Sequence, residues 1–450
     1  MAGTEDLDLR RAGLAGRYLQ VRALTEALAA PLSPEDQTIQ TMPDVSPTKW
    51  HRGHTSWFFE TFLLEPSLTG YRACHPAYAY IFNSYYEAVG ARHPRAERGL
   101  VSRPGAGDVG RYRAHVDEAM DRLLGADLAA DVLDLVDLGL NHEQQHQELL
   151  LMDIKHVLSK NPLRPAYRDA SADAGPFQPA PTQPASAQPA SGEVAKPGWI
   201  EHQGGTVEVG HAGNRFGYDN EFPRHLAHLV PFALADRTVT CGEWLAFMDD
   251  GGYARSDLWL SDGWAVVQAE HRTAPLYWST GPDGEPDDWR VFGLGGDQPV
   301  DPTEPVCHVD YYEADAFARW SGARLPTETE WETVAAESPV DGNLLEPVPT
   351  GRDPGSPDGS APHPVGSADG GRQLFGDVWE WTASAYSPYP GFRPAAGAVG
   401  EYNGKFMVNQ YVLRGGSCAT PTDHIRSTYR NFFPAGARWA FSGVRLARDL

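Results

Sequence analysis

Cysteine is scarce in this chain, with only four among 450 residues (Cys74, Cys241, Cys307 and Cys418). They are widely spaced and form no Cys-x-x-Cys pair, which argues against a disulfide framework and a cysteine-rich zinc site. The first ten residues, MAGTEDLDLR, are polar and acidic and lack the apolar stretch of a signal peptide. Both observations lead us to expect a protein of the reducing cytoplasm.

Positive charge and long apolar runs are also lacking. The chain has 37 lysines and arginines against 60 aspartates and glutamates, which gives a net charge of −23. Because there is no basic excess to replace counterions, we expect neither nucleic acid nor a membrane surface as a partner. No apolar run approaches the ~20 residues that span a bilayer. Hydrophobic residues still make up 41% of the chain, enough to bury folded cores.

The composition changes twice along the chain. Residues 1–165 show helical periodicity, and one helix is expected over about 108–124. Residues 166–198 are rich in proline, alanine, serine and glutamine, cannot bury a core, and are predicted to be an exposed linker. From Trp199 onward, tryptophan, glycine and asparagine become frequent and only short β-like or helical pieces remain. The pattern predicts an α+β multidomain protein with a four-helix bundle, a linker and a loop-rich domain at 199–450.

The stretch Asn141–Glu148 (NHEQQHQE) carries two histidines four residues apart, flanked on both sides by leucines at helical spacing. Side chains at this spacing share one helix face, with Cβ atoms roughly 5–6 Å apart. His142 and His146 are therefore predicted to bind one transition metal ion, with a third histidine from an earlier helix. The same letters fit the zinc-protease pattern HExxH, with Glu143 as the base, and a pair of core histidines without metal is the other alternative.

The earlier helix is expected to begin at a Ser46 cap followed by Pro47 and to continue to about residue 64. His54 falls on its aromatic, inward face, whereas His51 lies about 60° around the helix. We expect His51 either to be partly exposed or to stand behind a metal ligand.

Several ordered motifs in the second half carry a family resemblance. They are Gly204-Gly-Thr, Asp219-Asn-Glu, Pro305-Val-Cys-His-Val, Arg324-Leu-Pro-Thr-Glu-Thr-Glu-Trp, Gly376-Asp-Val-Trp-Glu-Trp, Arg414-Gly-Gly-Ser and Phe441-Ser-Gly-Val-Arg-Leu. This half resembles the formylglycine-generating-enzyme or sulfatase-modifying-factor domain, which has a C-type-lectin-like fold, and the first half resembles a DinB-like four-helix bundle. That order of domains resembles the ergothioneine-biosynthesis sulfoxide synthases (hercynine oxygenases) and the related ovothiol and selenoneine enzymes.

The resemblance implies a non-haem Fe(II) held by His54, His142 and His146, since Trp50-x-x-x-His54 and the HExQH stretch match the family's ligand patterns. Three neutral imidazoles leave positions open for a thiol, a substrate imidazole and O2. The implied substrates are small molecules, namely hercynine (Nα-trimethylhistidine), a thiol donor and O2. We expect the enzyme to be a monomer.

The resemblance also implies further site residues. Arg95 and Arg98 match arginines that bind donor carboxylates, and planar guanidinium forks suit this task. Gln145, Asn431 and Phe432 match positions near the histidine betaine, where an aromatic ring can meet a quaternary ammonium.

Two groups of tyrosines compete for the role of proton or hydrogen donor. Tyr386 and Tyr389 match the region that carries this tyrosine in one branch of the family, with Tyr389 expected beside the substrate. Tyr85 and Tyr86 match the N-terminal loop that carries it in another branch. We slightly favour Tyr386, and the sequence leaves the choice open.

Two departures from the family patterns bear on the substrate. Enzymes that use γ-glutamylcysteine carry Asp and Arg where this chain has Phe433 and Ala437, with Arg438 displaced by one position. Cysteine is therefore the more probable donor. Only Cys418 lies where formylglycine-generating enzymes keep a copper-binding cysteine pair, so oxidation of a peptide cysteine is not expected. The alternatives are a selenoneine synthase, an ovothiol-type enzyme and a non-catalytic lectin-like module.

Overall fold

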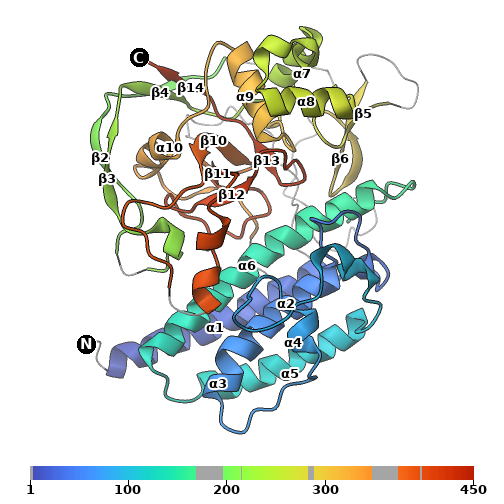
Figure 1. The fold of residues 1–450 in the computed structure, drawn as a ribbon, viewed down its shortest axis with the longest axis vertical. Helices are drawn as coiled ribbons and strands as arrows, with labels where there is room; N and C mark the ends of the chain where they lie inside the picture. The colour runs from blue at the N-terminus through green and yellow to red at the C-terminus, as the bar shows by residue number, and fades with distance from the viewer. Residues whose placement is uncertain (1–3, 169–195, 214, 282–287, 347–372, 396–397) are drawn as a thin grey trace, which may run out of the picture.

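The computed structural model describes residues 4–168, 196–213, 215–281, 288–346, 373–395 and 398–450. One half of the molecule is built of helices, and the other holds the strands together with shorter helices (Figure 1). We call residues 4–168 the helical half and the described residues from 196 onward the sheet half. Most of the predicted linker lies outside the described residues. Within the described ranges, no helix is long and apolar enough to cross a membrane.

Four long helices pack against one another in the helical half. The helical elements are α1 (Thr4–Ala29), η1 (Asp36–Thr38), α2 (Thr48–Phe59), the π-helical η2 (Glu60–Leu64), α3 (Glu65–Ser67), α4 (Tyr78–Ile81), η3 (Arg95–Leu100), α5 (Ala106–Leu124) and α6 (Ala130–Ser159). Helices α1 and α2 each contact both α5 and α6. The periodicity predicted for α5 is confirmed, because Val109, Tyr112, Val116 and Met120 are fully buried along one face.

The predicted cap of α2 is wrong in one detail. The helix begins at Thr48 with Pro47 at the N-cap position and no side-chain cap. The Ser46 hydroxyl instead accepts a 2.8 Å hydrogen bond from Nη1 of Arg98, 52 residues away. A long-range contact has therefore replaced the local cap that the sequence suggested.

The sheet half is made of small sheets, short helices and long connections. Its strands are β1 (Trp199–His202), β2 (Gly205–Val209), β3 (His225–Leu229), β4 (Phe232–Ala235), β5 (Trp278–Thr280), β6 (Trp289–Gly293), β7 (Gly296–Pro299), β8 (Gly342–Asn343), β9 (Phe375–Gly376), β10 (Trp379–Ala385), β11 (Gln410–Arg414), β12 (Asn431–Pro434), β13 (Ser442–Gly443) and β14 (Ala447–Asp449). Its helices are α7 (Cys241–Asp249), α8 (Ser261–Glu270), α9 (Tyr311–Trp320) and α10 (Glu328–Ala335), with 3-10 turns η4 (Asp219–Glu221), η5 (Gly252–Ala254), η6 (Ser256–Leu258), η7 (Ala398–Glu401) and η8 (Gly404–Phe406). The central sheet has the order β12-β11-β10-β13, and β1-β4-β14 forms a second sheet.

Buried ion pairs join the sequence motifs of the sheet half to one another. Arg445 binds Glu380 at 2.7 Å, and both side chains are buried. Arg414 binds Glu328 at 2.9 Å, also in the interior. Because an arginine buried without its carboxylate would be strongly destabilising, these motif residues are explained by the fold rather than by the chemistry of a site.

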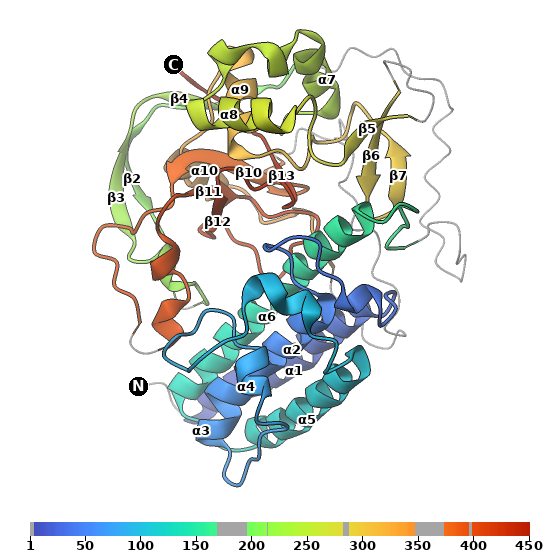
Figure 2. The ribbon, with the colours of Figure 1, turned by 45° about the vertical axis from the view of Figure 1, so that its right-hand side comes forward.

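Helix α6 borders both halves of the molecule, as the two views show (Figure 1, Figure 2). The buried carboxylate of Glu148 accepts hydrogen bonds from three side chains of the sheet half: Trp379 at 2.6 Å, Ser417 at 2.6 Å and Thr420 at 2.8 Å. These contacts seat the sheet half on α6 within one turn of His146, on another face of the helix.

Candidate metal centre and its cavity

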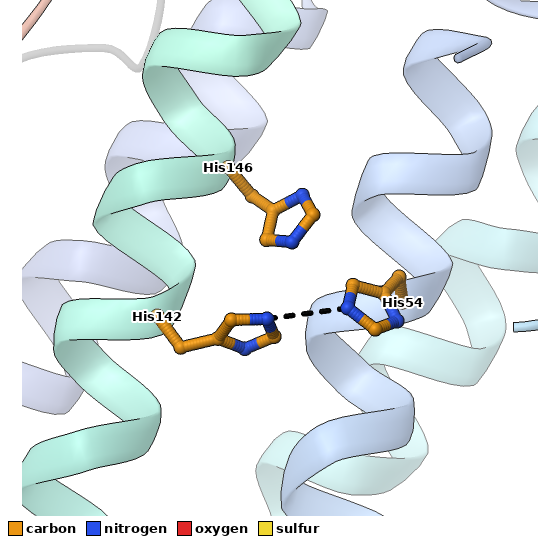
Figure 3. A group of neighbouring side chains, drawn as sticks. All are labelled: His54, His142 and His146. Carbon is orange, nitrogen blue, oxygen red and sulfur yellow. Dashed lines mark hydrogen bonds between the residues drawn. The ribbon is translucent and has the colours of Figure 1, made fainter. Parts of the chain in front are cut away.

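Three histidines meet where α2 faces α6 (Figure 3). His54 comes from α2, and His142 and His146 come from successive turns of α6. One ring nitrogen from each lies within 4.8 Å of the others, and Nε2 of His54 is 3.2 Å from Nε2 of His142. The spacing of four residues on α6 therefore produces the convergent pair that the sequence predicted, and α2 supplies the third imidazole.

The ring of His54 is fixed on both faces and at one nitrogen. Trp50 stacks on it with centroids 4.6 Å apart, and Trp57 stacks on it at 5.4 Å. Its Nδ1 lies 2.6 Å from the carbonyl oxygen of Phe82. Since a carbonyl only accepts, Nδ1 carries the proton and the Nε2 lone pair remains available to a metal.

His51 is buried, not partly exposed. Its Nδ1 lies 2.9 Å from Nδ1 of His146, and its Nε2 lies 3.0 Å from Oδ2 of Asp153. Of the two expectations for His51, the position behind a ligand is therefore the one found.

Burial keeps the three imidazoles neutral. It lowers the pKa of His142 to about 3. Burial, followed by the neighbouring histidines, holds the pKa values of His54 and His146 well below their usual range. Neutral imidazoles offer lone pairs, and three of them form a donor set that suits iron, copper, nickel or zinc. The residues therefore fit a divalent transition metal.

Glu143 lies in a different environment from the histidines beside it. Its carboxylate accepts hydrogen bonds from Arg22 at 2.9 Å, Arg113 at 2.9 Å and Thr25 at 2.7 Å. Burial alone would raise the pKa of Glu143, but the two arginines lower it to about 2. A carboxylate that is held ionised between two arginines is a poor general base, which removes the basis for the zinc-protease alternative.

A cavity of about 640 Å³ opens beside the histidines. It is lined by Ser46, Trp50, His51, Ser84, Tyr85, Arg92, Pro94, Arg95, Arg98, His142, Gln145, His146, Leu149, Asp153, Tyr402 and Phe406. The guanidinium of Arg98 lies 3.3 Å from the ring centroid of Trp50, and Arg95 donates to the carbonyl of Asp44. Both arginines of the predicted donor site therefore reach the cavity that contains two of the predicted ligands.

Five other predicted residues do not line this cavity. Among the described residues in its wall, Tyr86, Tyr386, Tyr389, Asn431 and Phe432 are absent. Tyr386 is buried, accepts a hydrogen bond from Asn220 at 2.9 Å, and stacks on Phe432 at 4.0 Å.

Phe432 in turn lies 6.0 Å from the ring of Phe406, which does line the cavity. Tyr389 accepts a hydrogen bond from Arg414 and lies under Arg430. The roles predicted for this group stay predictions.

Comparison with known proteins identifies the family. Residues 185–450 match the Sulfatase-modifying factor enzyme 1-like domain. Hercynine oxygenase of Mycolicibacterium thermoresistibile is 33% identical over 434 residues, which cover 91% of this chain and 88% of the relative. This chain belongs to the hercynine oxygenase family. It is therefore an enzyme and an oxygenase.

Other members and neighbours of the hercynine oxygenase family match more locally. Hercynine oxygenase of Mycobacterium tuberculosis is 42% identical over 246 residues, which cover 52% of this chain and 56% of the relative. The formylglycine-generating enzyme of Streptomyces coelicolor is 32% identical over 264 residues, or 50% of this chain and 81% of that enzyme. The match to the Mycolicibacterium thermoresistibile enzyme thus extends over both the helical half and the sheet half.

Tyr402 is a cavity residue that the sequence did not reveal. Its ring lies 5.6 Å from that of His142, and its hydroxyl donates to Oε1 of Gln145. The amide nitrogen of Gln145 donates to the hydroxyl of Tyr429 at 2.6 Å. Tyr402 belongs to no motif, and only the fold brings its segment, which lies about 260 positions along the chain from Gln145, against α6.

The residues at and beside the positions that depart from the γ-glutamylcysteine pattern make contacts within the sheet half. Phe433 packs against Trp439 with centroids 5.6 Å apart, and Ala437 is buried. Arg438 binds Glu313 at 2.9 Å and the carbonyl of Ala274 at 2.6 Å.

Proposed function

We propose that this enzyme joins hercynine to a thiol by using O2 and Fe(II), and so forms a sulfoxide in ergothioneine biosynthesis. The observation that carries the proposal is the set of three neutral histidines, two of which line a cavity whose wall includes Arg95 and Arg98. The net reaction replaces the imidazole C–H and the thiol S–H by a C–S bond. One oxygen atom of O2 goes to sulfur, and the other leaves as water with the two hydrogens.

His54, His142 and His146 would hold the metal. Bound there, Fe(II) supplies the redox chemistry with O2 and favours the thiolate form of the donor. The protein's own contribution begins with Arg98, which is fixed by Ser46 and Trp50 and presents its planar fork to the donor carboxylate, while Arg95 adds positive charge at the rim. Binding the carboxylate in this way would orient the donor sulfur toward the histidines.

Part of the cavity wall is aromatic and would fit the trimethylammonium group of hercynine. Tyr85, Tyr402 and Phe406 present their rings to the cavity, and quaternary ammonium groups are attracted to such faces. Gln145 lies between His142 and His146 in the chain and would hydrogen-bond hercynine beside the metal. Asn431 and Phe432 would support this wall from behind.

Tyr85 is our candidate for the residue that holds a proton at the reacting atoms. It lines the cavity, whereas Tyr386 does not. Burial raises the pKa of Tyr85 above its usual value, so the phenol keeps its proton at neutral pH and can donate it. Tyr86 stacks on Tyr85 at 4.6 Å and would hold that ring in place.

We propose cysteine rather than γ-glutamylcysteine as the sulfur donor. The γ-glutamyl group carries an additional carboxylate and ammonium, which need charged partners. The positions that could supply them hold Phe433 and Ala437, and Arg438 is already bound to Glu313. Free cysteine lacks this second carboxylate, and its single carboxylate can be bound by Arg98 and Arg95.

We further propose that the helical region is a DinB-like bundle over 1–165, followed by a linker over 166–198 and a C-type-lectin-like domain over 199–450. The enzyme is proposed to act as a cytoplasmic monomer.

Product mass spectrometry tests the proposed reaction. Fe(II)-loaded enzyme receives hercynine, O2 and equal amounts of cysteine and γ-glutamylcysteine. A cysteine-derived sulfoxide is expected. The γ-glutamyl adduct would retain the reaction and reject the donor, whereas no adduct from either thiol would reject the function. Parallel incubations with a selenosugar, or with unmethylated histidine, then distinguish the selenoneine and ovothiol reactions.

A further inference from the structure

A buried aspartate lies behind the metal site, on the same helix as two of its histidines. Asp153 follows His146 by seven residues, two turns of α6, and is 3% exposed. Its Oδ2 accepts a hydrogen bond from the backbone amide of Ser46 at 2.8 Å and lies 3.0 Å from Nε2 of His51. Its Oδ1 accepts one from Nε1 of Trp439 at 3.2 Å. The carboxylate thus joins α6 to two segments that are distant from it in the sequence, residues 46–51 and the one that carries Trp439.

His51 links His146 to Asp153 through two hydrogen bonds, and these bonds allow one arrangement of protons. His146 needs its Nε2 lone pair for a metal, so its proton lies on Nδ1, which is 2.9 Å from Nδ1 of His51. Nδ1 of a neutral His51 must then accept, and its own proton lies on Nε2, where it is donated to Asp153. Donation therefore runs in one direction, from His146 to His51 and from His51 to the carboxylate of Asp153.

A second branch runs from the same carboxylate toward the proposed donor site. The amide of Ser46 donates to Asp153, while the Ser46 hydroxyl accepts from Arg98 at 2.8 Å. Arg98 lies over Trp50 at 3.3 Å from its centroid. Trp50 stacks on the ligand histidine His54 at 4.6 Å. Both branches line the same cavity, since Ser46, His51, Arg98 and Asp153 are all in its wall.

We propose that Asp153 is the positioning residue of the whole site: through His51 it fixes the orientation and tautomer of His146, and through Ser46 it fixes the arginine that receives the sulfur donor. This inference rests on the three-histidine metal site of the proposed function. Outer hydrogen-bond partners of metal-bound histidines commonly change metal affinity 10- to 100-fold. A single carboxylate would therefore couple metal affinity to donor affinity.

The first test measures metal binding alone, with Co(II) as the probe. Equilibrium dialysis gives the affinity, and the Co(II) absorption spectrum reports the geometry of the ligands. His51→Leu is expected to weaken Co(II) binding by roughly 10- to 100-fold and to alter the spectrum. His51→Gln can still accept from His146 and donate to Asp153, so it should stay within about threefold of the wild type.

A matched control uses another buried histidine, His156 of α6. His156 is 5% exposed and bonds Thr41 at 2.7 Å. It does not line the cavity described above. His156→Leu makes the same chemical change as His51→Leu and should leave Co(II) affinity and spectrum unchanged. A loss caused by general destabilisation would affect both variants alike.

The second test separates the two branches. In the Co(II) protein, cysteine binding is followed by the thiolate-to-cobalt absorption band. Ser46→Ala keeps the backbone amide that binds Asp153 but removes the acceptor of Arg98, so cysteine affinity should fall roughly 10-fold while Co(II) affinity is unchanged. His51→Leu should show the opposite pattern, and Asp153→Ala should impair both.

The outcomes separate a failure of the metal site from a failure of the role proposed for Asp153. Wild-type protein that binds no Co(II) would reject the metal site on which the inference rests. If the wild type binds Co(II) and cysteine, and folded His51→Leu and Asp153→Ala bind both equally well, the inference is overturned and the proposed function remains intact. If Asp153→Ala does not fold, the opposite patterns of His51→Leu and Ser46→Ala still decide.

Discussion

Two loops of this enzyme each carry a pair of tyrosines, and the structure places them differently. Tyr85 and Tyr86 follow α4 in the helical half, and Tyr85 lines the cavity beside the histidines. Tyr386 and Tyr389 follow β10 in the sheet half, where Tyr386 bonds Asn220 and Tyr389 accepts from Arg414. The two pairs match the family patterns equally well, but of these four tyrosines only Tyr85 lines the cavity, whereas Tyr386 and Tyr389 belong to the interior of the sheet half.

The sheet half reaches the cavity through a different segment, residues 398–406. Its Tyr402 and Phe406 stand where Tyr386 was expected. The segment is tied to the helical half by Glu401, whose carboxylate accepts from the amides of Glu87 at 3.0 Å and Ala88 at 2.9 Å. These contacts anchor the loop that carries Tyr85 to the segment that carries Tyr402. The two tyrosine pairs thus differ because the segment 398–406, and not the loop after β10, contributes to the cavity beside the metal site.

The largest effect should come from removing a ligand, which tests whether the cavity is the reaction site at all. His142→Ala is expected to abolish stoichiometric iron binding and to lower sulfoxide formation roughly 1,000-fold or more, because two imidazoles hold the metal less firmly than three. Iron content and turnover are measured on the same preparation. Full iron content with full turnover would contradict the assignment, and His156→Ala is the control for a buried histidine lost from α6.

The tyrosine comparison is tested directly by two matched variants. Tyr85→Phe removes a hydroxyl from the cavity wall and should slow sulfoxide formation by roughly 10²- to 10⁴-fold, the usual range for a lost proton donor. Tyr386→Phe removes a hydroxyl from the interior and should change the rate less than about fivefold. Single-turnover rates at saturating cysteine provide the measurement. The reverse order of effects would assign the role to Tyr386 and reject our preference for the N-terminal loop.

A smaller effect is expected at the arginines. Arg98→Met should raise the KM for cysteine roughly 10- to 100-fold with a smaller change in kcat, because it removes a fixed charged fork from the donor carboxylate. Arg95→Met, at the exposed rim, should raise KM less. Steady-state kinetics with varied cysteine distinguish the two. An unchanged KM in both variants would place the carboxylate elsewhere, with Arg92 of the same wall as the next candidate.

The smallest effect concerns stability, where α6 enters the sheet half. Burial lowers the pKa of Lys155 to about 8, and its Nζ lies 2.5 Å from Nε2 of His308. In the unfolded chain this amine keeps its proton to a pKa of about 10.5. Below pH 8 both states are protonated and the folded state bears the full penalty of the buried charge. Between pH 8 and 10.5 only the folded state loses the proton, so the free energy of unfolding rises with pH.

Lys155→Met should therefore raise the free energy of unfolding at pH 7 by roughly 1–3 kcal/mol. The gain over the wild type should shrink as the pH rises from 8 to 10. Denaturant unfolding of both proteins at several pH values gives the difference directly, so that titrating groups common to both proteins cancel. A variant that is less stable than the wild type at pH 7 would show that the contact with His308 outweighs the cost of burial.

The sequence predicted well wherever the relevant contacts are local. His142 and His146 share a helix face because of their spacing, and the period of α5 identified its buried side. The spacing also placed His54 on the inward face of α2. The remaining features depend on contacts between residues that are distant in the sequence. The Ser46 hydroxyl, for example, does not cap α2 but accepts a hydrogen bond from Arg98, 52 positions along the chain.

The cavity wall could not be predicted for the same reason. Tyr402 contacts Gln145 from 257 positions away, and no periodicity or motif announces such a pair. Asp153 resembles any acidic residue near the end of a helix until Ser46 and His51 are found around it. Motif matching was also incomplete, since it could not reveal that Phe406 stands between Phe432 and the cavity.

Helix α6 has a consequence for how such a protein can be altered by recombination. Glu148, which three side chains of the sheet half bind, lies within one turn of His146, and each residue advances the helix by about 100°. An insertion of one residue between His146 and Glu148 would turn the carboxylate away from Trp379 while leaving the histidines in place. The halves therefore cannot be exchanged as independent modules. A helical half taken from a relative would bring its own residue at the position of Glu148. The sheet half of such a hybrid would have to pack against that side chain.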